Sequence, residues 1–180
     1  MSTKNLYTLL ADLLVYPKED IGPRIKECLA ALDGAGYPPE AAAELKKFQH
    51  EVESVSLDDI QGIYSYTFEM TSDYTLDIGS LLYDGFKRSS KLSALKSMYM
   101  DTGFPYDEVA KGELPDHLPV LLRFLGYSQD AALKHDLVET FINLAMEKLS
   151  KNFHRNKGNL YAHLIDAIYR VIDKDVKEAK

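Results

Sequence analysis

Apolar residues recur at steps of three and four along almost the whole chain, and no segment alternates apolar and polar residues in a run rich in Val, Ile and Thr. This periodicity is typical of helices that each bury one face. The opening stretch illustrates it with Leu6, Leu9, Leu10, Leu13 and Leu14. We therefore predict an all-α protein, a helical bundle or globule in which residues 1–180 form one domain.

Helix breakers and caps divide the chain into expected helices. Helices are expected over residues 3–15, from residue 20 to the glycines at 34 and 36, from the prolines at 38 and 39, from Ser56, and over 90–101, 117–126, 129–152 with Ser128 as its cap, and 159–177. Residues 101–116 form the longest polar connection and carry Gly103 and Pro105. This connection would be the hinge if two copies of the chain exchanged their C-terminal helices.

Charge and cysteine content exclude several classes of function. The chain of 180 residues has 21 Lys and Arg against 28 Asp and Glu, a net charge of -7, which disfavours nucleic acid and anionic lipid as partners and favours basic ones. Cys28 is the only cysteine, which excludes an internal disulfide and fits a reducing cytoplasm. Asp12 interrupts the apolar opening and no stretch is long enough for a membrane span, so we expect a cytoplasmic protein without a targeting segment.

The segment GELPDHLPVLLRFLGY, residues 112–127, places Glu113, Asp116 and His117 within about one turn of each other. Asp116 has the character of a helix N-cap, and Pro119 would then occupy the first turn, where its missing N–H costs no hydrogen bond. Capping does not require Glu113 or His117. Two carboxylates and an imidazole at the mouth of a connection also suit a cation, a cofactor group or a basic peptide.

An enzyme would need more than these three side chains. The remaining histidines form no pair at ligand spacing, and the chain has no phosphate loop, GxSxG or dinucleotide fingerprint. We therefore predict no catalytic residues, no metal ligands and no bound cofactor. A small helical metal-dependent hydrolase centred on Glu113, Asp116 and His117 is the main alternative, and a helical adaptor with an unrelated partner is another.

Aromatic residues are dense between residues 64 and 106, where acidic residues and methionines lie among them. Most of these aromatic side chains are expected in the core or at its rim. Tyrosine also suits a wet apolar groove, and methionine adds adaptable apolar surface. The mixture could receive a peptide with a basic end and an apolar end, although a solvated helix face explains the acidic residues equally well.

These segments together resemble a known family. ELPDHLP followed by VLLRFL is similar to the signature of the NarJ group of molybdoenzyme assembly chaperones, in the wider TorD/DmsD superfamily. YSYTF from Tyr64 to Phe68 resembles the family's Tyr-x-x-Thr-Phe block, and SLLYDGF from Ser80 to Phe86 resembles its apolar-aromatic block. LLADLLVYP at the start also resembles the family. Where nitrate-reductase chaperones usually carry a Gly-Asp-x-Arg-x-Arg-Gly-like run, this chain has FKRSSKL. We therefore expect a client that is either nitrate reductase or a relative of it.

The resemblance implies an all-helical cytoplasmic chaperone rather than an enzyme. Such a protein binds the N-terminal region of a molybdoenzyme catalytic subunit, often a twin-arginine signal peptide, and holds the apo form until the molybdenum cofactor is inserted. By the same resemblance, the client-binding residues are expected to be Glu113, Pro115, Asp116, His117, Tyr64, Phe68, Tyr83 and Phe86.

Overall fold

The computed structural model describes residues 5–156 and 158–178, and it confirms the all-α fold class. Within these ranges there is no strand of a sheet, and residues 77 and 117 form an isolated bridge. The α-helices are α1 (Leu6–Leu13), α2 (Gly22–Gly34), α3 (Pro39–Glu53), α4 (Leu57–Tyr64), α5 (Gly85–Asp101), α6 (Tyr106–Ala110), α7 (Leu118–Tyr127), α8 (Ala131–Leu137), α9 (Asn143–Phe153) and α10 (Tyr161–Glu178).

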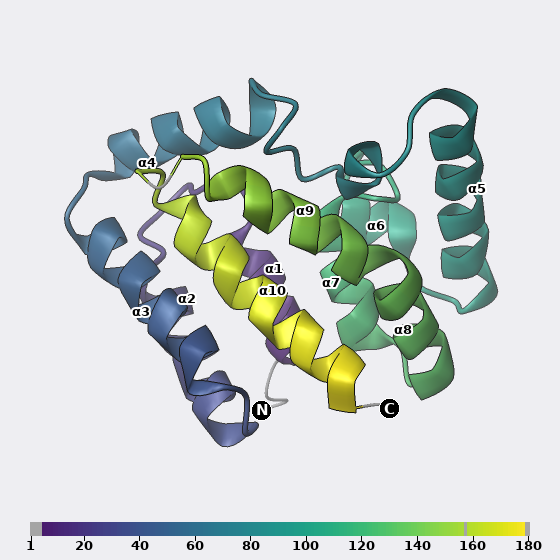
Figure 1. Cartoon of the computed structure of the whole chain (residues 1–180), viewed down its shortest axis with the longest axis horizontal. Coiled ribbons are helices and arrows are strands. Elements are labelled where there is room, and N and C mark those ends of the chain that lie inside the picture. The colour runs from purple at the N-terminus through teal and green to yellow at the C-terminus, as the bar shows by residue number, and fades with distance from the viewer. Residues whose placement is uncertain (1–4, 157, 179–180) are drawn as a thin grey trace.

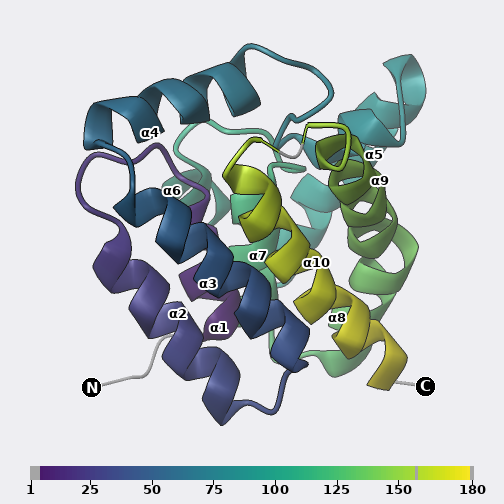
Figure 2. The same ribbon diagram turned by 60° about the vertical axis from the view of Figure 1, so that its left-hand side comes forward.

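The helix α10 lies at the centre of the packing, where it contacts α3 on one side and α9 on the other (Figures 1 and 2). It buries an apolar residue at nearly every turn, from Tyr161 to Val176. Behind it, α1 packs against α7 and α2. One hydrophobic cluster runs through all of these contacts, as the three- and four-residue spacing of apolar residues predicts.

Several helices begin where a polar side chain accepts a hydrogen bond from an N–H of the first turn. Ser56 forms the expected N-terminus of α4, because its hydroxyl accepts from the N–H of Asp59 while the Asp59 carboxylate accepts from the Ser56 N–H. The prediction that Ser128 caps the next-to-last helix is wrong. Asp130 is the cap of α8, since its carboxylate accepts from the N–H of Leu133. The first helix is capped by Asn5, and residues 3 and 4 of its expected range lie outside the described residues.

Three short helices of other types interrupt the α-helical pattern: the π-helical turns η1 (Ser65–Glu69) and η3 (Val138–Ile142), and the 3₁₀ turn η2 (Ile78–Leu81). The expected helix over 129–152 is therefore α8 and α9 joined by a π-helical turn. Each π-helical turn admits an extra residue, so it changes which side chains face the core. The η1 turn buries Thr67 and Phe68 and leaves Tyr66 exposed.

The connection at 101–116 is less open than its composition predicts, because it contains α6. Helix α5, which precedes it, lies at one edge of the molecule and has Leu95 and Tyr99 as its buried residues (Figure 1). No helix in the described part of the chain combines the length and the hydropathy needed to cross a bilayer.

Candidate functional site

The ELPDHLP segment runs antiparallel beside residues 76–78, a stretch some 40 residues earlier in the chain. The Ile78 N–H donates to the Asp116 carbonyl at 3.2 Å, and the Leu118 N–H donates to the Leu76 carbonyl at 2.7 Å. These two bonds satisfy backbone groups of two irregular segments. They also place the side chain of Asp77 beside that of His117.

Two tyrosines support the segment from behind. The chain leaves α6 through Lys111 and Gly112, which have φ values of 51° and 94° in the left-handed region. The Tyr106 hydroxyl then donates to the Glu113 carbonyl at 2.6 Å, and the buried Tyr99 hydroxyl donates to the Pro115 carbonyl at 2.8 Å. Two carbonyl groups of the motif backbone are thus bound by tyrosine hydroxyls.

Asp116, predicted as a client contact, is also not the N-cap that its position before a helix suggests. The N-cap position of α7 belongs to His117, and no side chain caps this helix. The Asp116 carboxylate is fully buried and faces Arg88 of α5, with nitrogen–oxygen distances of 3.1 to 3.3 Å from Nε and Nη2. Burial raises the pKa of the Asp116 carboxyl above its usual range, and the Arg88 guanidinium only partly opposes this.

Gly79 leaves the space that Asp116 occupies. A Cβ at residue 79 would lie 2.3 Å from Oδ2 of Asp116 and 3.2 Å from its Cγ. A glycine at this position of η2 is therefore a condition for burying the carboxylate. The pair of Arg88 and Asp116 thus joins α5 to the motif, in addition to the hydrogen bond from Tyr99 to Pro115.

His117 and two carboxylates form the solvent-facing part of the motif. His117 Nδ1 lies 2.8 Å from Oδ1 of Asp77 and 3.7 Å from Oε2 of Glu113. The side chain of Glu113 is 56% exposed, that of Asp77 is 32% exposed, and that of His117 is 15% exposed, so charge is accessible mainly through the carboxylates. We call these three residues the acid–imidazole cluster. Their ligand atoms all lie within 4.8 Å of one another, close enough to share one metal ion.

The other predicted contact residues are distributed between core and surface. Tyr64 and Phe68 are buried and pack edge-on against Tyr161 of α10, so core packing accounts for both. Pro115 is also buried. Tyr83 is half-buried and stacks on Phe141, whereas Phe86 is 86% exposed at the start of α5.

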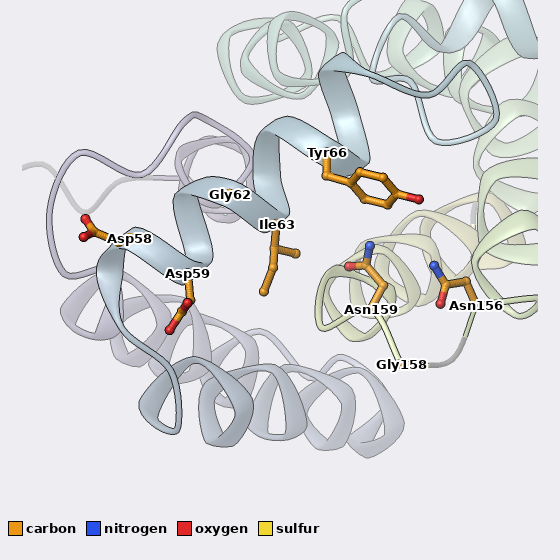
Figure 3. A pocket seen from close by; sticks show the side chains of 8 residues that line it. All are labelled: Asp58, Asp59, Gly62, Ile63, Tyr66, Asn156, Gly158 and Asn159. Carbon is orange, nitrogen blue, oxygen red and sulfur yellow. The ribbon is translucent and has the colours of Figure 1, made fainter.

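A hollow of about 420 Å³ lies between the helix α4 with its η1 extension and the residues Asn156, Gly158 and Asn159, which lie between α9 and α10 (Figure 3). Asp58, Asp59 and the exposed ring of Tyr66 line one side, and Asn156 and Asn159 line the other. Asn159 Nδ2 donates to the Thr67 hydroxyl at 2.6 Å, which ties the two walls together. The described lining residues of the hollow include the carboxylates of Asp58 and Asp59 and the ring of Tyr66. Of these, only Tyr66 lies in the aromatic stretch of residues 64–106 that was expected to receive a peptide.

Arg88 and Gly79 surround the ELPDHLP motif and were not predicted from the sequence. Asp77 was expected only as one of several acidic residues among the aromatic ones, not as a partner of His117. Arg88 lies in FKRSSKL, a segment that the sequence marks only as a departure from the family pattern. Asp77 and Gly79 lie between weak aromatic blocks, and no local spacing connects them to residues near 116. The sequence offers one signal for such a partner: the motif carries carboxylates, and a carboxylate that becomes buried needs a cation from elsewhere in the chain.

No protein-family model matches this chain, and no curated protein matches it. The resemblance to molybdoenzyme assembly chaperones therefore stays a prediction that depends on the motifs.

Proposed function

We propose that this chain is a cytoplasmic assembly chaperone of the NarJ type. It binds the N-terminal, signal-peptide-like segment of the apo form of a molybdoenzyme catalytic subunit, nitrate reductase or a relative, before the molybdenum cofactor is inserted. The observation that supports this best is the acid–imidazole cluster. Of the polar residues of the ELPDHLP motif, Asp116 is buried against Arg88, whereas Glu113 and His117 form the partly exposed cluster with Asp77. This cluster has two carboxylates available for a basic partner.

The arrangement suits weak and reversible binding. A Lys or Arg near Glu113 and Asp77 would form ion pairs that remain in contact with water, and such pairs contribute about 0.2–1 kcal/mol each. A chaperone must release its client after maturation, so contacts of this strength fit the role. The ordered backbone around the motif means that little conformational entropy is lost on binding.

We assign the second part of the peptide site to the hollow of Figure 3. Tyr66 is 58% exposed and offers a ring face on which a guanidinium or an apolar side chain can stack. Met70 follows η1 and is 74% exposed, which adds adaptable apolar surface. These residues, rather than the buried Tyr64 and Phe68, are the aromatic and apolar contacts we assign to the client.

The first prediction concerns the cluster. Replacing Glu113 with glutamine should weaken binding of a client N-terminal peptide about two- to fivefold, because one exposed ion pair is lost. The same variant should show a smaller loss of affinity between low and high salt, since fewer charge pairs remain to be screened. Calorimetric titration at two salt concentrations measures both effects.

Glu108→Gln is the matched control, because Glu108 is an exposed glutamate on α6 that is outside the cluster. Equal effects of the two substitutions would show that net charge, not the motif, attracts the peptide. A protein that binds no N-terminal segment of any molybdoenzyme would contradict the chaperone proposal itself. Affinity capture from the native cell with mass spectrometry identifies the client, and it also separates a chaperone from an adaptor with an unrelated partner.

A metal-dependent hydrolase is the second candidate, and the ligand spacing of the acid–imidazole cluster is the observation that favours it. The possible metal ligands in the structure differ from the metal centre predicted from the sequence, because Asp77 takes the place of Asp116. Asp116 already faces Arg88, which disfavours it as a ligand.

We expect no stoichiometric metal in the purified protein, because three ligands of which two already bond to each other hold a divalent ion weakly. Elemental analysis of the parent and of His117→Ala measures this. One zinc, iron or manganese per chain that is lost in the variant would place the hydrolase above the chaperone.

A further inference from the structure

A second cavity, of about 300 Å³, lies away from the motif where α1, α7, α8, α10 and the α2–α3 connection meet. Leu125, Val138 and Val176 supply apolar walls. The volume is at the lower end of the range for ligand cavities, so it fits a small molecule and not a peptide. Neither the fold nor the proposed chaperone function accounts for the polar groups that line it.

One side of the cavity presents the carboxyl group of Asp175. The hydroxyls of Tyr7 and Tyr37 both donate to Oδ2 of this carboxyl, the second at 3.0 Å. Burial raises the pKa of the Asp175 carboxyl, and the two phenol hydrogen bonds only partly oppose that. Tyr37 is held in turn by Lys174, whose Nζ lies 4.8 Å from the centre of its ring. An acceptor oriented by two tyrosines in an apolar cavity is suited to a ligand ammonium group.

Another part of the cavity lining consists of basic side chains. Lys134 and His135, both half-buried on α8, line the same cavity as Asp175. His135 lies 3.4 Å from Glu139 on its own helix. Among the described residues, neither Lys134 nor His135 comes within 4.0 Å of the Asp175 carboxylate, so charges of opposite sign line one cavity without contact between them.

We propose that this cavity binds a small zwitterion, an α-amino acid with an aliphatic side chain. The ammonium group would bond to Asp175, the carboxylate would face Lys134 and His135, and the side chain would pack on Leu125, Val138 and Val176. A simple cation or a simple anion would satisfy only one of the two charged parts of the lining. An amino acid satisfies both and also removes apolar surface from water.

The probe is L-leucine, tested on the full-length protein by calorimetry and by thermal unfolding. At a concentration about 100-fold above its dissociation constant, a ligand of the folded state should raise the Tm by roughly 5–10 °C for a chain of this size. Isopentylamine lacks the carboxylate and 4-methylpentanoate lacks the ammonium group, and each should bind about tenfold more weakly or worse. Absence of leucine binding, or equal binding of all three compounds, would overturn the proposal.

The location is tested by a pair of neighbouring substitutions on α8. Ala131 and Ala132 are both exposed, but only Ala131 lines the cavity. Ala131→Phe should fill the cavity and abolish leucine binding, whereas Ala132→Phe should leave it unchanged, with both variants folded. Equal leucine binding by the two variants would place the ligand elsewhere. Neither substitution touches the acid–imidazole cluster, so peptide binding reports on the chaperone proposal separately.

Discussion

Replacing Arg88 with alanine is expected to lower the free energy of unfolding by about 3–5 kcal/mol at neutral pH. The reason is that the Asp116 carboxylate, whose side chain is fully buried, would lose the guanidinium that faces it. Arg88 itself is 25% exposed and is solvated in the unfolded chain, so the cost arises mainly from the uncompensated carboxylate. Urea denaturation followed by circular dichroism measures the change. Lys87→Ala, at an exposed neighbouring position of α5, is the control and should change stability by less than about 0.5 kcal/mol.

The effect of Arg88→Ala should depend on pH in a defined direction. The pKa of Asp116 is raised in the folded protein, so its ionisation disfavours the folded state once the pH rises above the pKa of the unfolded chain, about 3.9. Removing Arg88 raises the folded pKa further. The loss of stability should therefore be small near pH 3 and grow toward pH 7.

The double variant Arg88→Ala with Asp116→Asn should recover part of the stability at pH 7, because no buried charge remains. A loss that does not change with pH, or a double variant no more stable than Arg88→Ala, would show that the pair acts through packing alone.

Gly79→Ala is expected to destabilise the protein by about 1–3 kcal/mol, because the new methyl group would overlap the Asp116 carboxylate. The backbone at Gly79 is not in the left-handed region, so the overlap and not the conformation is the cause. The Asp116 side chain would have to leave its position between Gly79 and Arg88. The denaturation midpoint and peptide binding should both decrease, since the bridge between residues 77 and 117 is adjacent to the overlap.

Gly62→Ala is the matched control for this substitution. Gly62 lies inside α4, and a Cβ there would meet no atom within 4 Å. Alanine is the better helix former, so this variant should be more stable by about 0.5–1 kcal/mol. Combining Gly79→Ala with Asp116→Ala should cost less than the sum of the two single losses, because the overlap disappears with the carboxylate. Additive losses would contradict the assigned role of Gly79.

The sequence predicted best where neighbouring residues decide the structure. The capping box of Ser56 and Asp59 starts α4 as expected, and the chain turns after α5 at Gly103 as expected. The start of α8 was misplaced at Ser128 because Ser and Asp are both good caps, and only the position of the following turn selects Asp130. The π-helical turns were not predicted, since an extra residue in a helix leaves the three- and four-residue pattern almost unchanged.

For the candidate site, the sequence identified Glu113, Asp116 and His117, but it did not show that Asp77 lies beside His117 or that Arg88 faces Asp116. Asp77 reaches His117 only because two segments pair through backbone hydrogen bonds, which carry no sequence signature. Tyr64 and Phe68 were predicted as client contacts, but both are buried, and both rings pack against Tyr161, the first residue of α10.

The sequence by itself determined the helical class, the approximate positions of most of the longer helices and the acidic, cysteine-poor character of this protein, because these depend on periodicity, local capping and composition. Only the tertiary structure decided what Asp116 does. A carboxylate before a helix satisfies the local rules for a cap, yet here it points inward, because Arg88 supplies a charge and Gly79 supplies the space. Both residues come from segments distant in the chain, and the energy of a buried charge depends on everything that surrounds it in space.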